Sequence, residues 1–208
     1  MDFVQRARGP VSRLGILPGT FNPLTVAHLA LGHAALSQVD EVLFTLPRAL
    51  PHKEYIGASF DERVEMLRAA LAGETQFSIA ASSGGLFVEI AGECRAAYGQ
   101  SVRLSFLCGR DAAERIADWD YGRPGAFPEM LSRFDLLVAA RGGSYRAPPA
   151  IASAVSPLML AGEFDHVSAT EVRDRIRRRE PWEHLVPEAI HGHVRRIYEG
   201  FFRGMARL

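Results

Sequence analysis

The chain is poor in the features that mark secreted, membrane-spanning and polyanion-binding proteins. Its 208 residues include only two cysteines, Cys94 and Cys108, so no disulfide framework forms and a cytoplasmic location is expected. No uncharged apolar run approaches the roughly 18–20 residues of a membrane span, and the N-terminus lacks the apolar core of a signal peptide. Basic and acidic residues number 24 each, and this balance argues against a nucleic-acid partner.

The apolar content of 48% is sufficient for a hydrophobic core. Strand patterns alternate with helical patterns along the chain, and this alternation predicts an α/β fold with a mostly parallel sheet and helices on both faces. We expect one domain over residues 1–208, with residues 1–12 as a flexible N-terminal segment. The predicted strands cover residues 14–17, 41–46, 77–80, 102–108, 135–140 and 157–160, and the predicted helices cover 28–36, 59–71, 86–98, 168–178 and 187–202.

The most informative segment is Gly19-Thr20-Phe21-Asn22-Pro23-Leu24-Thr25-Val26-Ala27-His28. It joins a predicted strand to a predicted helix, so it forms a glycine turn and a helix start. Backbone N–H groups and the positive end of the helix dipole bind phosphate at such a place. Thr25 and His28 share one face of the first helical turn, where both can meet an anion. The pattern predicts phosphate chemistry, and the alternative is an ordinary strand-to-helix turn.

Further candidates for binding anions lie in a loop and in a later helix. Lys53, in the loop after the second predicted strand, can neutralise a phosphate, or it is a solvated loop lysine. Ser168 and Glu171 have the spacing of a capping box, which by itself explains both residues. Thr170 and Arg173 add a hydroxyl and a guanidinium on one helical face, which suits phosphate groups.

The histidines do not have the spacing of a metal site. His28 and His33 are five residues apart, and His191 and His193 are two apart, so neither pair matches a zinc-binding helix. We therefore predict no metal held by protein ligands alone.

The chain resembles the nucleotidylyltransferase superfamily, the cytidylyltransferase-like enzymes, in two separate signatures. Residues 19–28 are similar to G-x-F-D-P-x-H/T-x-G-H, and Val167-Ser168-Ala169-Thr170-Glu171-Val172-Arg173 is similar to I-S-S-T-x-x-R. Asn22, Ala27 and Ala169 depart from these signatures. Within the superfamily, the chain most resembles the nicotinate-mononucleotide adenylyltransferases, with further matching segments at residues 51–53, 63–67, 109–111, 119, 141–142 and 186–198.

This resemblance implies a Rossmann-like fold and transfer of AMP from ATP to a pyridine mononucleotide, with release of pyrophosphate, in NAD biosynthesis. ATP is the co-substrate, and Mg²⁺ accompanies it, held largely by phosphates and water. Catalytic roles are implied for His28, Lys53 and Arg173. Nucleotide binding is implied for Gly19, Thr20, Phe21, Thr25, His28, Gly109, Asp111, Ser168, Thr170 and Arg173. Acceptor binding is implied for Lys53, Leu86, Phe87, Trp119 and Arg141.

The main departure from the nicotinate-specific relatives lies at Gly85-Leu86-Phe87, where those enzymes usually carry Ser-Tyr-Thr. Leu86 and Phe87 have no polar side chain for a pyridine carboxylate. One alternative is therefore AMP or CMP transfer to another small phosphate, such as phosphopantetheine. Another is a nucleotide-binding protein without turnover. The partners expected are small-molecule substrates, with no membrane, and the sequence leaves a homo-oligomer open.

Overall fold

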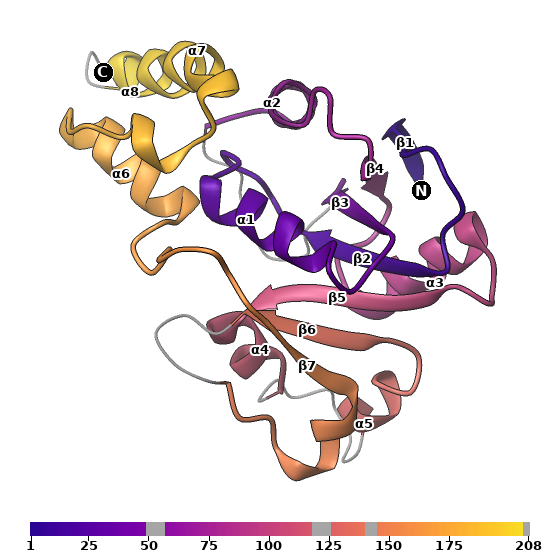
Figure 1. The fold of residues 1–208 in the computed structure, drawn as a ribbon. Coiled ribbons are helices and arrows are strands. Elements are labelled where there is room, and N and C mark those ends of the chain that lie inside the picture. Colours follow the sequence, from indigo (N-terminus) through magenta and orange to yellow (C-terminus); the bar gives the residue numbers. More distant parts are fainter. Residues whose placement is uncertain (49–56, 118–125, 140–144, 206–208) are drawn as a thin grey trace.

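The computed structural model describes residues 1–48, 57–117, 126–139 and 145–205, which form a seven-stranded sheet flanked by helices (Figure 1). The strand order is β1-β4-β3-β2-β5-β6-β7. Every neighbouring pair is parallel except β1 with β4. The strands are β1 (Asp2–Gln5), β2 (Arg13–Pro18), β3 (Glu41–Pro47), β4 (Phe77–Ser82), β5 (Arg103–Gly109), β6 (Asp135–Ala139) and β7 (Val155–Leu158).

Helices cover both faces of the sheet, as the sequence predicts. Side chains alternate along β3: Phe44 packs toward α1, α2 and α6, whereas Leu43 packs toward α3, α4 and α5. The α-helices are α1 (Val26–Ala35), α2 (Phe60–Ala70), α3 (Phe87–Tyr98), α4 (Arg110–Ala117), α5 (Ala126–Met130), α6 (Ala169–Arg178), α7 (His191–Val194) and α8 (Gly200–Met205). Short 3₁₀ segments are η1 (Pro149–Ala154), η2 (Glu183–Leu185) and η3 (Glu188–Ile190), and η4 (Arg195–Glu199) is a π-helical turn between α7 and α8.

The structure departs from the predicted elements in several places. Helix α5 was not predicted, and the predicted helix 187–202 is divided into η3, α7, η4 and the start of α8. Residues 2–5, expected to be flexible, form β1 on the edge of the sheet, where Asp2 pairs with Ala81 of β4. The last strand, β7, covers 155–158 instead of 157–160. Helix α4 begins directly after β5, where no helix was predicted. These elements are short, so the local pattern that would predict them is weak.

The direction of the crossovers reverses at β2. From β2 the chain goes to β3 and then β4 on one side, whereas β5 pairs with β2 on the other side. Ile16 pairs with Phe106, so the turns after β2 and β5 leave the sheet next to each other. In Figure 1, α6 and the C-terminal helices lie beyond this end of the sheet. Ligands of open α/β sheets bind at such a reversal point, so this edge of the sheet is the first place to look for a site.

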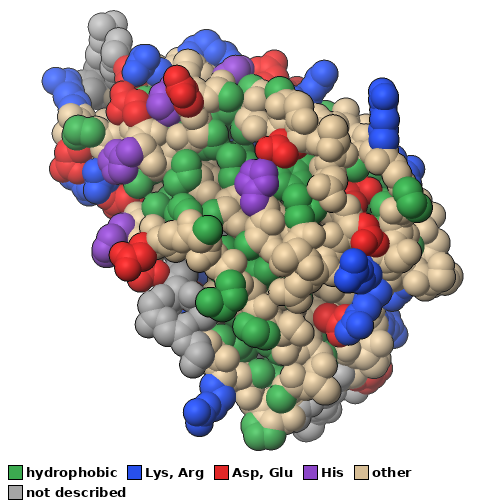
Figure 2. Space-filling model, viewed as in Figure 1, with side chains coloured by type: hydrophobic (Ala, Val, Ile, Leu, Met, Phe, Trp, Pro, Cys, Tyr) green, Lys and Arg blue, Asp and Glu red, His purple; other side chains and the backbone are tan. Residues whose placement is uncertain are grey.

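The visible surface mixes charges of both signs. Basic and acidic side chains are interspersed around the rim of the face drawn in Figure 2, and apolar side chains gather toward its middle. No helix within the described parts of the chain combines the length and apolar character needed to cross a bilayer.

Asp40 connects the beginnings of β2 and β3. Its carboxylate accepts hydrogen bonds from Arg13 N at 2.8 Å and Ser12 N at 2.9 Å, and it pairs with the Arg13 guanidinium at 3.0 Å. These contacts hold the pKa of Asp40 below its usual value. The hydrogen bond from the backbone N–H of Arg13 contributes most, followed by that from Ser12.

We predict that Asp40→Asn lowers the free energy of unfolding at pH 7 by about 1 kcal/mol. The amide oxygen can still accept from both backbone N–H groups, but the negative charge is lost and the amide NH₂ then faces the Arg13 guanidinium. A carboxyl whose native pKa is lowered contributes stability above its unfolded pKa, about 3.9, and loses it as the pH falls through the native pKa. The difference between wild type and variant should therefore vanish in acid. Denaturant unfolding from pH 2 to 7 measures this, with the exposed Asp165→Asn as control. A pH-independent difference would contradict the assignment.

Candidate active site

The turn between β2 and α1 is shaped by the ring of Phe21. The backbone of Phe21 lies in the left-handed region, with φ of 46°, and its ring is buried. A Cβ atom at Gly19 would lie only 2.9 Å from two atoms of that ring. The N–H of Gly19 donates to Thr45 O of β3 at 3.0 Å. Gly19 is therefore a glycine because the Phe21 ring occupies the place of its side chain, and its N–H is used within the fold.

The imidazole of His28 is oriented by Thr25 and Phe21. The backbone N–H of Thr25 donates to His28 Nδ1 at 3.0 Å, and Thr25 Oγ1 lies 2.7 Å from the same nitrogen. The Phe21 ring meets the imidazole edge to face, with 5.3 Å between centroids. Because a backbone N–H can only donate, Nδ1 is the acceptor and the neutral ring carries its proton on Nε2. The structure thus joins Thr25 and His28, as predicted, and makes His28 a hydrogen-bond donor through Nε2.

Two arginines from distant helices hold the carbonyl groups of this turn. Arg63 of α2 is buried and donates through Nη1 to Thr20 O at 3.0 Å and through Nε to Ser59 O at 3.2 Å. Arg173 of α6 donates through Nη1 to Asn22 O at 2.5 Å. Arg173 therefore lies beside the turn. Arg63 was not among the predicted site residues, although it lies in one of the segments that carry the family resemblance.

The N-terminus of α6 brings Ser168, Thr170 and Arg173 together next to the turn. Arg173 Nη1 also donates to Ala169 O at 3.1 Å, and Nη2 donates to Thr170 Oγ1 at 3.2 Å. Ser168 and Thr170 are exposed to solvent. The positive end of the α6 dipole therefore lies beside two hydroxyl groups and a guanidinium, an arrangement suited to an anion.

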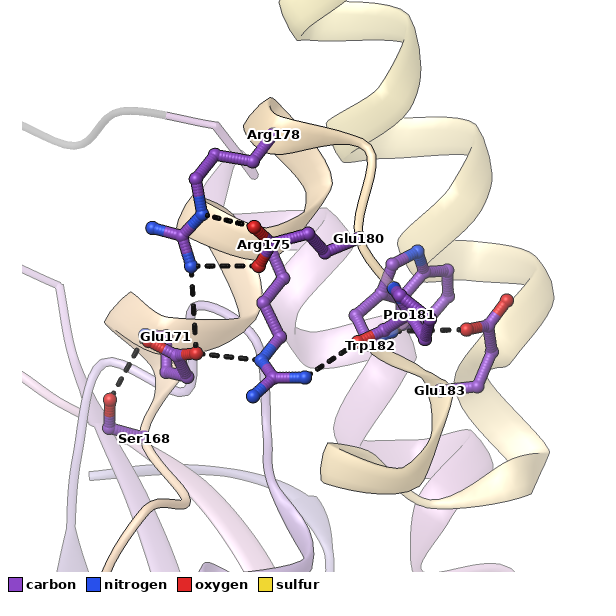
Figure 3. Close-up of polar contacts among 8 residues, drawn as sticks. All are labelled: Ser168, Glu171, Arg175, Arg178, Glu180, Pro181, Trp182 and Glu183. Carbon is purple, nitrogen blue, oxygen red and sulfur yellow. Dashed lines mark hydrogen bonds and ion pairs between the residues drawn. The ribbon is translucent and has the colours of Figure 1, made fainter.

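The predicted capping box at the start of α6 is only half formed. Glu171 N donates to Ser168 Oγ at 3.0 Å, whereas the Glu171 carboxylate pairs with Arg175 Nε at 2.6 Å. Figure 3 shows that Arg175 also donates a hydrogen bond to Pro181 O and that Arg178 pairs with Glu180. Three of the four arginines in residues 175–179, Arg175, Arg177 and Arg178, are thus engaged in ion pairs on the surface of α6.

Next to the end of β2, the chain continues from β5 directly into α4. Gly109 ends β5, and Asp111 lies in the first turn of α4 with its side chain exposed. The ion pair of Asp111 with Arg110 is long, at 3.8 Å, so the carboxylate retains most of its solvation. The neighbouring Cys108 is buried, and this burial raises its thiol pKa to about 12, so it is unreactive.

The predicted acceptor residues Leu86 and Phe87 have different environments. The Phe87 ring stacks on Phe106 with 4.2 Å between centroids and an interplanar angle of 8°. Leu86 is the N-cap of α3 and is 54% exposed, and its N–H donates to Glu89 Oε2 at 3.0 Å. The side chain of Phe87 is thus half-buried and packs against the core through Phe106.

Three predicted site residues, Lys53, Trp119 and Arg141, lie outside the described residues. Within the described ranges no group of three or more histidine, cysteine and acidic side chains is arranged to hold a metal ion. The described part of the site therefore consists of the turn 19–25, His28, the start of α4, the start of α3 and the start of α6.

Comparison with known proteins adds both sequence and fold similarity. Residues 16–175 match the cytidylyltransferase-like family. The chain is 30% identical over 199 residues to the "Probable nicotinate-nucleotide adenylyltransferase" of Bordetella avium, covering 88% of this chain and 95% of that protein. A protein of the same name from Gloeobacter violaceus is 30% identical over 204 residues, covering 90% and 96%. The fold resembles that of a Plasmodium falciparum nicotinic acid mononucleotide adenylyltransferase complexed with NaAD, with a TM-score of 0.69, 14% identity and coverage of 89% and 95%.

The contacts of Arg173 predict the effect of Arg173→Lys. Arg173 binds the carbonyls of Asn22 and Ala169 through Nη1 and Thr170 Oγ1 through Nη2. Lysine keeps the charge but has a single nitrogen and no planar guanidinium, so it cannot hold all three oxygens in this geometry. We expect the unfolding midpoint without nucleotide to fall by about 2–6 °C, measured by differential scanning fluorimetry. Arg177→Lys, on the exposed face of the same helix, is the matched control and should leave the midpoint unchanged. Equal midpoints for the two variants would show that Arg173 does not anchor the turn.

Proposed function

The chain belongs to the cytidylyltransferase-like family, and on this premise we propose that it is an adenylyltransferase of NAD biosynthesis. It transfers AMP from ATP to a pyridine mononucleotide and releases pyrophosphate. The relatives from Bordetella avium and Gloeobacter violaceus, which match over most of both chains, support this assignment by their names. The observation that carries the proposal is the fixed tautomer of His28 at the turn between β2 and α1, beside the point where the crossovers reverse.

In the proposed reaction, a phosphate oxygen of the acceptor attacks the α-phosphorus of ATP in line with the leaving pyrophosphate. No covalent bond to the enzyme forms, so catalysis consists of positioning and charge stabilisation. His28 Nε2–H donates to a phosphate oxygen on which negative charge builds. Thr170 and Arg173 at the start of α6 bind the β- and γ-phosphates and then pyrophosphate. Mg²⁺ enters with ATP and shields the phosphate charges.

The remaining roles follow from position and from the family resemblance. Gly109 and Asp111 at the end of β5 bind the nucleoside part of ATP, and Ser168 binds a terminal phosphate. Lys53 neutralises the attacking phosphate, and Trp119 and Arg141 bind the acceptor together with Leu86. The reducing cytoplasm is the proposed compartment, since Cys94 and Cys108 are buried free thiols.

Pyrophosphate release with Mg-ATP and a panel of acceptors tests this function. The panel contains nicotinate mononucleotide, nicotinamide mononucleotide and phosphopantetheine, with CTP in place of ATP as a second arm. Turnover with ATP and a pyridine mononucleotide supports the proposal. Turnover only with phosphopantetheine or only with CTP overturns it, as does nucleotide binding without pyrophosphate release.

His28→Ala should lower kcat by about 10²–10³-fold, because one preorganised donor to a transition-state oxygen is worth about 3–4 kcal/mol. The control is His33→Ala, on the same helix, where the imidazole is exposed and pairs with Glu74 at 3.4 Å. Steady-state pyrophosphate release measures both variants, with circular dichroism as the check of folding. Full turnover in a folded His28→Ala protein would remove His28 from the mechanism.

The environment of Leu86 and Phe87 predicts weak discrimination between nicotinate and nicotinamide mononucleotide. A site with buried polar groups for a substrate rejects an analogue that lacks the matching group by about 10⁴-fold or more. Neither side chain provides such a group, so we expect the ratio of kcat/KM for the two acceptors to stay far below this value. A ratio of about 10⁴ in favour of nicotinate mononucleotide would show that other residues recognise the carboxylate.

A further inference from the structure

The side chain of Asn22 joins three segments that are distant in the sequence. Its Oδ1 accepts a hydrogen bond from the hydroxyl of Tyr198 at 2.5 Å and one from Ala58 N at 3.4 Å. Both Asn22 and Tyr198 are buried. Because an amide oxygen has two lone pairs, these two donors use its accepting capacity. Asn22 lies inside the turn 19–25, so its side chain links the C-terminal helices to the proposed phosphate site.

Tyr198 is held firmly at this place. It lies in the π-helical turn η4, and a Cβ atom at Gly57 would come within 2.8 Å of its ring atom Cε1. The backbone of Gly57 has φ of 103°, so a glycine is required there both for conformation and for the space of the ring. Burial raises the pKa of the Tyr198 phenol above its ordinary value, and the hydroxyl therefore remains a protonated donor.

The hydrogen bond from Tyr198 acts on the same residue that Arg173 holds. Arg173 binds the backbone oxygen of Asn22, and Tyr198 binds its side-chain oxygen. Without the phenolic donor, the amide side chain keeps only the longer of these two bonds, from Ala58 N at 3.4 Å, so the peptide that anchors the guanidinium is held less firmly. Both contacts lie one residue beyond Phe21, whose left-handed backbone sets the course of the turn.

We propose that Tyr198 is a positioning residue for nucleotide binding, which fixes the turn 19–25 through Asn22 and thereby holds Arg173 in place for the triphosphate. The triphosphate role rests on the proposed function, whereas the fixing of the turn does not. Tyr198 touches no substrate in this scheme. The C-terminal helical segment thereby supports the nucleotide site without contacting the nucleotide itself.

Tyr198→Phe tests the proposal because it removes one hydroxyl and keeps the ring that packs on Gly57. Tyr98→Phe is the matched control: its hydroxyl also donates to a buried side chain, Glu41, far from the turn. In the full-length protein, amide hydrogen exchange of the peptide 19–25 should accelerate by about two- to tenfold in Tyr198→Phe only, the range expected for one hydrogen bond. Equal exchange rates in the two variants would overturn the proposal.

Nucleotide binding gives the second readout. The Kd for Mg-ATP should rise by about two- to tenfold in Tyr198→Phe and stay at the wild-type value in Tyr98→Phe. Asn22→Ala should weaken binding as well, and the double variant Asn22→Ala with Tyr198→Phe should be no weaker than Asn22→Ala alone, because both remove the same bond. Additive losses would overturn the proposed route through Asn22. A wild-type chain that binds no ATP would overturn the proposed function, and the exchange rates would then decide whether Tyr198 fixes the turn.

Discussion

The carbonyl groups of Thr20 and Asn22 are held by guanidinium groups from α2 and α6, and the rest of the site depends on this restraint. The turn makes few backbone hydrogen bonds of its own and contains Phe21 in the left-handed region, which costs on the order of 1 kcal/mol. A hydrogen bond from a charged donor contributes about 1.5–3 kcal/mol, so the two arginines more than offset this cost. The docked helices α2 and α6 thus hold the turn together with the bond from Gly19 N–H to Thr45 O and the buried ring of Phe21.

This dependence explains why the anion-binding groups converge. The sheet places the ends of β2 and β5 next to each other, but it does not by itself bring α6 to that edge. The contact of Arg173 with Asn22 brings α6 to this edge. The buried side chains Val172 and Ile176 pack α6 against the same core as Phe21. Burial of such apolar side chains contributes about 1.5–3 kcal/mol each, so packing holds the helix and the guanidinium sets its position along the turn.

The sequence predicted the features that depend on local patterns. The mostly parallel sheet, the helices on both faces and the helix predicted over residues 59–71, which is α2 with Ser59 as its N-cap, were predicted correctly. The capping box at Ser168 is incomplete because Arg175, one helical turn beyond Glu171, competes successfully for its carboxylate. Strand β1 and the contact between Tyr198 and Asn22 were not predictable, because each joins segments more than 70 residues apart and leaves no periodic signal.

The departures from the family signatures differ in what they change. Asn22 keeps an oxygen acceptor and uses it for Tyr198 and Ala58, so the substitution preserves a structural contact. The methyl group of Ala27 is buried and presents little surface to a ligand. At 86–87, by contrast, one side chain is a half-buried phenylalanine stacked on Phe106 and the other is an exposed leucine. The polar groups that the nicotinate-specific relatives carry there have no substitute among these two side chains. A site selects its substrate by the polar groups that the substrate satisfies or leaves unpaired, so this departure bears on the proposed acceptor, whereas the oriented His28 bears on the proposed phosphate transfer itself.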